Sequence, residues 1–290
     1  MHDNPQTPPP PLPAALEHRV ITMTGRDSSA FAQAQFMNDV DAIAPGHWQW
    51  NGWLTPKGRV IALFALLKLD AETLWLLLPD ADPSNMADGL RRFVFRSKVA
   101  MAVRDDLLVT GCFGACAGVQ GNAFAIDSEG ALELDMGGDG GPRCLRIATG
   151  AACSAEADAV ARWAACDLEH GLPRLPNSQI EQWTPQQLTL DRLHGFSVKK
   201  GCYPGQEIVA RTHFLGKVKR GVVLLESDAP LSAGADVHAS GTAIGKVVAI
   251  ASDGDRHLGL AVLPLERDSP VSDAGGVPVR EASIEDGLAR

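Results

Sequence analysis

Residues 199–220 read KKGCYPGQEIVARTHFLGKVKR, and this stretch predicts a stiff turn that leads into a short helix. Gly201 permits backbone angles that are closed to other residues, whereas Pro204 fixes its own φ and biases the residue before it away from the helical region. Pro204 and Glu207 suit the first turn of a helix, and Gly216 can end it. Cys202 is therefore expected just ahead of a helix N-terminus.

The charge around Cys202 favours an ionised sulfur, because neighbouring cations and a helix N-terminus both stabilise a thiolate. Between residues 192 and 220 seven Lys or Arg accompany a single acid, Glu207, although the whole chain has a net charge of −9. This local basic charge indicates an anionic ligand. Two interpretations of Cys202 remain: a reactive or metal-binding cysteine, or a small buried hydrophobic residue, which is the commoner fate of free cysteines.

The segment KGCYPGQEIVAR, followed by LGKVKR, resembles the signature K-G-C-Y-x-G-Q-E of the YgfZ family, folate-binding relatives of the glycine-cleavage T protein, an aminomethyltransferase. Further segments match in the same order. They extend the resemblance over roughly residues 15–265 and are FAQAQFMNDV (31–40), GWLTPKGRVIALFALLK (52–68), LRRFVFRSKV (90–99) and GLPRLPNSQIEQWTPQQLTLDRL (171–193).

An α+β fold is expected, because strand and helix patterns are mixed without the regular alternation of a doubly wound sheet. The resemblance implies T-protein-like folate-binding subdomains around a central channel. We predict a disordered Pro-rich tail at 1–14, two α+β subdomains at about 15–110 and 111–220, and a small C-terminal β-barrel at 221–290, where short strands follow one another closely.

Local patterns predict the elements of the first subdomain. HWQWNGWLT, RVIALFALLKLD and LWLLLP read as a β-meander, and the continuous apolar run in its middle suggests a strand that is buried on both faces. Asp27 is predicted to cap a helix that runs through Asn38. A second helix is predicted to start at Asp82 and its following proline and to end near Phe95.

The resemblance implies a site for tetrahydrofolate, or a derivative of it, at the junction of the subdomains. The basic stretch around Cys202, or the basic residues of 91–98, would hold the anionic glutamate tail, although a charge run is often only a solvated face. The residues that we expect at the folate are Asn38, Trp53, Arg96, Glu169 and Lys199.

Four aromatic residues of the meander have two possible roles. They could form a stacking wall for the pterin ring, or they could pack the core, which is the commoner role of clustered aromatics. These residues are Trp48, Trp50, Trp53 and Phe64.

The resemblance makes Cys202 the key residue, and its role stays open between a ligand of a transient iron-sulfur cluster or persulfide, a redox thiol and a nucleophile toward a folate-borne one-carbon unit. Its motif neighbours are expected to tune the thiol, to shape the turn, to position the helix or to contact a partner. They are Lys200, Gly201, Tyr203, Gly205, Gln206, Glu207 and Arg211.

Two departures from the T protein bear on the reaction. The T protein has a carboxylate pair after G-G-V-I, with its first aspartate at the reactive nitrogen of the folate, whereas GRVIALFAL has Ala62 and Leu63 there, and alanine cannot relay a proton. In DLEHG (167–171), Asp167 stands where the T protein has the arginine of R-L-E-x-G. The resemblance therefore favours the YgfZ branch, which is linked to iron-sulfur cluster assembly or repair and to tRNA modification, over glycine cleavage.

The sequence suggests three classes of function. The leading hypothesis is a tetrahydrofolate-binding accessory protein whose partners are iron-sulfur enzymes or their assembly proteins. The alternative is a folate-dependent aminomethyl or methyl transferase, in which another group replaces the missing carboxylate. Asp39 is the nearest candidate, although its segment also reads simply as a helix C-terminus. Direct nucleic-acid binding is disfavoured by the net charge of −9, by the single tyrosine and by the lack of an aromatic-basic motif.

The six cysteines (112, 116, 144, 153, 166 and 202) fit reduced thiols better than a disulfide framework in a chain of this size. Cys112 and Cys116 are spaced C-x3-C without a second pair, which is only a weak zinc motif. The N-terminal stretch lacks the features of a secretory signal or transit peptide, and the apolar run from Val60 to Leu67 is too short to cross a bilayer. A cytoplasmic location without membrane contact is expected.

Overall fold

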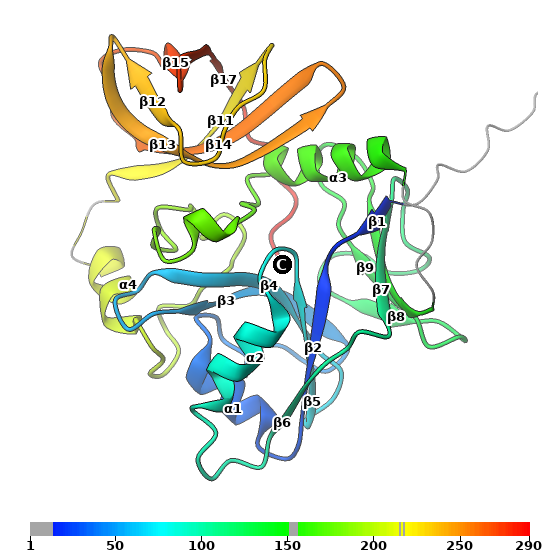
Figure 1. Cartoon of the computed structure of the whole chain (residues 1–290). Coiled ribbons are helices and arrows are strands. Elements are labelled where there is room, and N and C mark those ends of the chain that lie inside the picture. The colour runs from blue at the N-terminus through cyan, green and yellow to red at the C-terminus, as the bar shows by residue number, and fades with distance from the viewer. Residues whose placement is uncertain (1–13, 151–155, 215, 217) are drawn as a thin grey trace, which may run out of the picture.

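The computed structural model describes residues 14–150, 156–214, 216 and 218–290. Residues 1–13 of the predicted tail lie outside this part of the chain, and Ala14 already belongs to the first strand. The described residues form three antiparallel sheets with helices packed on them (Figure 1). The predicted mixture of helices and sheets is confirmed.

The first sheet has the strand order β3-β4-β5-β2-β6 and contains the predicted meander. Alternate residues of its second strand, β4, belong to two different hydrophobic cores, with Leu63 in one and Phe64 in the other. The continuous apolar run is thus a strand with both faces buried, as predicted. The strands are β2 (Arg19–Thr24), β3 (His47–Leu54), β4 (Val60–Lys68), β5 (Thr73–Leu78) and β6 (Ala100–Val103).

Two helices, α1 (Ser28–Gln35) and α2 (Pro83–Arg91), pack on this sheet, and both are shorter than predicted. The Asp82 carboxylate caps α2 by accepting the Asn85 N–H at 2.7 Å, but the helix ends at Arg91 rather than near Phe95. Helix α1 ends before Asn38 because Phe36 is extended and bridges to Trp53.

The second sheet has the order β1-β7-β10-β9-β8, and helix α3 (Ala157–Glu169) covers its inner face. Gly111 of β7 allows this close approach, since a Cβ there would overlap the ring of Trp163. A buried ion pair between Arg143 and Asp167, with 2.8 Å between nitrogen and oxygen, joins the sheet to α3. The strands are β1 (Ala14–Leu16), β7 (Leu107–Cys112), β8 (Phe124–Ile126), β9 (Leu132–Asp135) and β10 (Cys144–Thr149).

The third sheet contains seven strands in the order β16-β15-β12-β13-β14-β11-β17. It curls over α3 but its two ends do not pair, so it is an open half-barrel rather than the closed barrel that we expected (Figure 1). Its strands are β11 (Arg220–Ser227), β12 (Asp236–Ala239), β13 (Thr242–Asp253), β14 (Arg256–Pro264), β15 (Asp273–Ala274), β16 (Val277–Pro278) and β17 (Arg280–Ala282).

The last residues leave this sheet and return to the middle of the molecule, where the C-terminus lies (Figure 1). Trp50 of the first sheet donates its indole N–H to the Leu288 carbonyl at 2.9 Å, and Arg290 donates to the Asp135 carbonyl of the second sheet. Residues 283–290 therefore tie the first two sheets together instead of extending the barrel.

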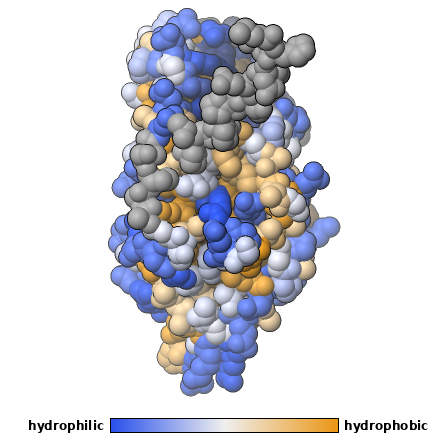
Figure 2. All heavy atoms as spheres, turned by 90° about the vertical axis from the view of Figure 1, so that its right-hand side faces the viewer, coloured by the Kyte–Doolittle hydropathy of each residue, from blue (hydrophilic) through white to orange (hydrophobic). Residues whose placement is uncertain are grey.

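The side of the molecule that bears β7 and β8 in Figure 1 mixes hydrophilic and hydrophobic residues, with hydrophobic ones gathered at mid-height (Figure 2). Among the described helices, none is long and apolar enough to cross a membrane.

Candidate functional site

The cysteine motif packs against the turn between β3 and β4 through two glycines. Gly205 has a φ of +83°, and a Cβ on it would lie 2.6 Å from the Thr55 carbonyl oxygen and 2.8 Å from the Gly58 Cα. Gly58 has a φ of +69°, and a Cβ on it would lie 2.9 Å from the Cβ of Ile208. The motif and the turn can approach this closely only because neither glycine has a side chain.

Gly201 does not use the backbone freedom by which we expected it to shape the turn. Its φ lies outside the left-handed region, and a Cβ there would meet no atom within 4 Å. The glycine that shapes the turn is Gly205, which directly precedes helix α4 (Gln206–Phe214).

Lys200 points into the protein rather than toward Cys202. Its ammonium donates three hydrogen bonds to backbone carbonyls at the end of α1 and beyond, of Gln33 at 2.7 Å, Phe36 at 2.7 Å and Asn38 at 2.9 Å. Burial lowers the pKa of Lys200 to about 8, and the nearby Asp39 opposes this shift. The expected role of Lys200 in tuning the thiol is therefore replaced by a structural one.

Cys202 is a free and exposed thiol in the part of the chain that the structure describes. The next residue, Tyr203, is buried, which raises the pKa of its hydroxyl to about 12. The Gln206 amide donates to the Lys200 carbonyl at 3.4 Å and closes the loop that bears the cysteine. Glu207 and Arg211 are exposed on α4. The motif thus presents one sulfur atom on a loop with buried anchors on both sides.

A cavity of about 600 Å³ opens beside the motif, between the end of α1, residues 186–199, α4 and the first strand of the half-barrel. We call it the junction cavity. Its apolar wall includes Phe196, Val198 and Leu265, and Lys199 supplies a cation. This mixture of apolar walls and a few polar groups is typical of small-molecule sites.

Two buried glutamines line the junction cavity, and each has an unsatisfied polar atom. Gln49 Nε2 and Gln186 Oε1 have no hydrogen-bond partner among the described residues. Buried polar groups are normally paired, so each of these side chains lacks one hydrogen bond, and both atoms are shielded from solvent in this conformation. Thr189 and His194 also line the cavity, with left-handed φ values of 52° and 53°. Strained backbone of this kind gathers at functional sites.

Two of the five expected folate residues, Asn38 and Lys199, line the junction cavity. The Asn38 amide already donates to the carbonyls of Trp50 at 2.8 Å and His194 at 2.6 Å, so this side chain holds the cavity wall together. Lys199 is exposed and carries its charge at the cavity.

The other three residues lie outside this cavity. Trp53 is buried in the core between the first sheet and its helices. Arg96 is exposed in the loop after α2, and Glu169 at the end of α3 forms an ion pair with Arg256. Of the five expected folate residues, the structure thus places only Asn38 and Lys199 at the junction cavity.

The four aromatic residues of the meander pack the core and form no wall of the junction cavity. Trp48 and Phe64 are fully buried, and Trp50 is 3% exposed. The aromatic residue in the cavity wall is Phe196, four residues before Lys200. Our sequence reasoning missed Phe196, Gln49 and Gln186, although the position of Phe196 just ahead of the motif was a usable signal.

Ala62, at the position of the missing carboxylate, is buried in the core under α1 and α2. Asp39 lines the junction cavity instead, and its carboxylate accepts a hydrogen bond from the Gln33 amide at 2.8 Å. The cavity therefore has a carboxylate, but it comes from the segment after α1.

The expectation that all cysteines are reduced is wrong for one pair, because Cys116 and Cys144 form a disulfide. The two residues are 28 positions apart, and the contact is made when a loop closes over the second sheet. Cys112, the other half of the C-x3-C spacing, keeps a free thiol.

Comparisons with known proteins confirm the resemblance on which the motif argument was built. No protein-family model matches the chain. A protein named tRNA-modifying protein YgfZ from Aliivibrio fischeri is 29% identical over 232 residues, which is 74% of this chain and 71% of that protein. The protein of the same name from Klebsiella pneumoniae is 27% identical over 228 residues, which is 72% of this chain and 69% of that protein. The chain is therefore similar to YgfZ proteins over most of its length.

The fold is that of the T protein. The crystal structure of glycine cleavage system aminomethyltransferase T from Bartonella henselae superposes with a TM-score of 0.71 at 14% identity, covering 93% of this chain and 84% of that chain. At this identity the match concerns the fold.

Proposed function

We propose that this protein binds tetrahydrofolate, or a derivative of it, in the junction cavity and supports the assembly or repair of iron-sulfur enzymes in the cytoplasm. The exposed thiol of Cys202 is its reactive group, as a ligand of a transient cluster or persulfide, a redox thiol or a nucleophile toward a one-carbon unit. The effect on tRNA modification that the names of the relatives imply would then be indirect, through an enzyme that contains a cluster.

One observation carries the folate part of the proposal: a cavity of about 600 Å³ that combines an apolar wall, two unpaired amide atoms and a lysine. A pterin ring is flat, which suits Phe196, and it has hydrogen-bond donors and acceptors on its edge, which Gln49 and Gln186 would meet by turning their amides into the cavity. The glutamate tail is anionic, which suits Lys199.

We expect wild-type protein and Cys202→Ala to bind tetrahydrofolate with the same affinity in a calorimetric titration, because Cys202 is outside the junction cavity. Lys199→Ala should weaken binding about tenfold, since a hydrogen bond to a charged group contributes about 1.5–3 kcal/mol. Phe196→Ala should weaken it at least as much by removing the aromatic wall.

Arg96→Ala is the matched control, because Arg96 is also an exposed cation of a basic stretch but lies away from the cavity. Its affinity should equal that of wild type. If Arg96→Ala weakens binding and Lys199→Ala does not, the folate site is elsewhere. If wild-type protein does not bind tetrahydrofolate at all, the folate part of the proposal is wrong.

The role of Cys202 is tested in a strain that lacks the native protein, with the activity of an iron-sulfur enzyme as the readout. We expect Cys202→Ser to lose most of the restored activity, because a hydroxyl replaces a thiolate poorly as a nucleophile and as a soft ligand. Cys166→Ser is the control, since burial raises the pKa of that thiol to about 11 and leaves it protonated. Full activity of Cys202→Ser would remove Cys202 from the mechanism.

A second candidate function is a folate-dependent aminomethyl or methyl transferase, and the position of Asp39 in the cavity favours it. The test supplies tetrahydrofolate with an aminomethyl, sarcosine or dimethylglycine donor and measures methylenetetrahydrofolate. Turnover that Asp39→Asn abolishes would establish this activity, with Asp39 as its acid-base group. Absence of turnover with all three donors would eliminate it.

A further inference from the structure

The outer face of the second sheet gathers sulfur and carboxylate groups from three neighbouring strands. Strand register places Cys112 of β7 opposite Cys144 of β10, and Cys144 opposite Asp135 of β9. Glu133 lies two residues before Asp135, so alternation puts its side chain on the same face. Leu134, between them, points to the core on the other side.

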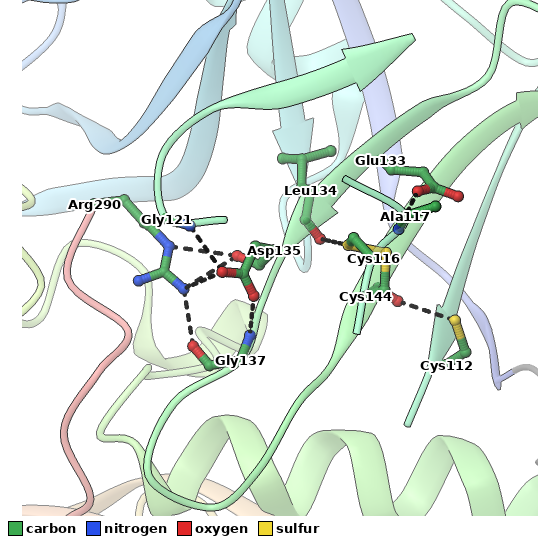
Figure 3. The surroundings of a disulfide bond; sticks show 10 residues. All are labelled: Cys112, Cys116, Ala117, Gly121, Glu133, Leu134, Asp135, Gly137, Cys144 and Arg290. Carbon is green, nitrogen blue, oxygen red and sulfur yellow. Dashed lines mark hydrogen bonds and ion pairs between the residues drawn. A yellow bond between two sulfur atoms is a disulfide. The ribbon is translucent and has the colours of Figure 1, made fainter. Parts of the chain in front are cut away.

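The loop after β7 folds over this face and brings in a third sulfur atom, that of Cys116 (Figure 3). The loop is held by the Ala117 N–H, which donates to Glu133 at 3.1 Å. The disulfide to Cys144 makes a second link, and the free Cys112 thiol donates to the Cys144 carbonyl at 3.6 Å. Cys144 is buried beneath this cover.

The group contains residue types that ligate metal ions in proteins. The sulfurs of Cys116 and Cys144 and a carboxylate oxygen of Glu133 all lie within 4.8 Å of one another. Thiolates and carboxylates are ligands of tetrahedral zinc, in which two sulfurs at about 2.3 Å from the ion are roughly 3.8 Å apart. A disulfide holds the two sulfurs far closer than that, so the oxidised protein cannot bind a cation between them.

We propose that reduction of the Cys116–Cys144 disulfide creates a binding site for a thiophilic divalent cation such as Zn²⁺, with Cys116, Cys144 and Glu133 as its ligands. A dithiol reductant supplies two electrons and two protons and is itself oxidised to a disulfide, while the S–S bond breaks into two thiols. The cation then displaces one proton from each thiol that binds it.

The loop has room for the sulfurs to move apart. A Cβ on Gly114, Gly118 or Gly121 would meet no atom within 4 Å, so open space surrounds the segment that carries Cys116. Cys116 also lines a hollow of about 860 Å³, together with Asp135, through which a reductant and a cation can enter. The segment that carries Cys116 therefore has space to shift between its two hydrogen bonds to β9, from Ala117 to Glu133 and from Gly121 to Asp135.

Co²⁺ is the probe, because it accepts the tetrahedral ligands of zinc and gives thiolate-to-cobalt charge-transfer absorption. The full-length protein is titrated with Co²⁺ after reduction by a phosphine and, in parallel, in its oxidised form. We expect one equivalent to bind to the reduced protein with a charge-transfer band that Zn²⁺ abolishes, and no band in the oxidised protein.

Variants assign the ligands. Cys116→Ser should weaken Co²⁺ binding at least tenfold, and because Cys116 is in the loop, circular dichroism can verify that the sheets remain folded. Cys112→Ser should leave the band unchanged, because Cys112 is outside the ligand group. Cys166→Ser, a thiol in α3, is the control and should leave the titration unchanged. The proposal is overturned if the reduced wild type shows no band, if Cys116→Ser binds as tightly, or if the oxidised protein binds equally.

Discussion

Replacing Lys200 by methionine is expected to lower the free energy of unfolding by about 3 kcal/mol, the largest effect of any lysine substitution in the motif. Its ammonium satisfies three backbone carbonyls, and each buried carbonyl that loses its partner costs roughly 1 kcal/mol or more. Methionine fills a similar volume but donates nothing. Urea unfolding followed by tryptophan fluorescence measures the change.

Lys199→Met is the matched control, because it removes the same charge at the neighbouring position. Lys199 is exposed, so its substitution should change the free energy of unfolding by less than about 0.5 kcal/mol. Equal effects of the two substitutions would show that the three hydrogen bonds of Lys200 contribute nothing to stability.

Repeating the unfolding measurement at several pH values tests the pKa of Lys200. The folded-state pKa of Lys200 is about 8, below its ordinary value of 10.5, so the unfolded chain holds this proton more tightly between these two values. Stability linked to Lys200 therefore rises as the pH rises from about 8 to 10.5. The difference in unfolding free energy between wild type and Lys200→Met should grow over this range, and a difference that shrinks would contradict the assignment.

Gly205→Ala is expected to destabilise the protein by about 3 kcal/mol and to displace the cysteine loop. A left-handed backbone costs a residue with a Cβ about 1 kcal/mol, and the added methyl group overlaps backbone atoms of Thr55 and Gly58 that cannot rotate away. Thermal unfolding measures the loss of stability. The alkylation rate of Cys202 reports the displacement of the loop.

Gly201→Ala is the control in the same motif, since a Cβ at Gly201 meets no atom within 4 Å and its φ is not left-handed. Its stability should lie within about 0.5 kcal/mol of wild type. If both alanine variants are equally stable, the motif is not held against the β3–β4 turn in the way the structure indicates.

Local signals in the sequence predicted what depends on neighbours along the chain. The three strands of the meander, the cap at Asp82 and the helix after Cys202 all follow from alternation, capping residues and Pro or Gly within a few positions. The resemblance to YgfZ proteins was visible for the same reason, because the motif is contiguous. Helix ends were less well predicted, since the end of α1 depends on a bridge from Phe36 to Trp53.

The tertiary structure decided which residues meet across long separations. Gly58 and Gly205 pack against each other, and Lys200 donates hydrogen bonds to carbonyls at the end of α1 and beyond. Gln49 and Gln186 line one cavity. No local sequence pattern links these positions. The pairing of Cys116 with Cys144, which overturned the expectation of reduced thiols, has the same origin. Such contacts depend on how the sheets and loops close in space, so the sequence by itself determined the elements and the motif, whereas packing determined the site.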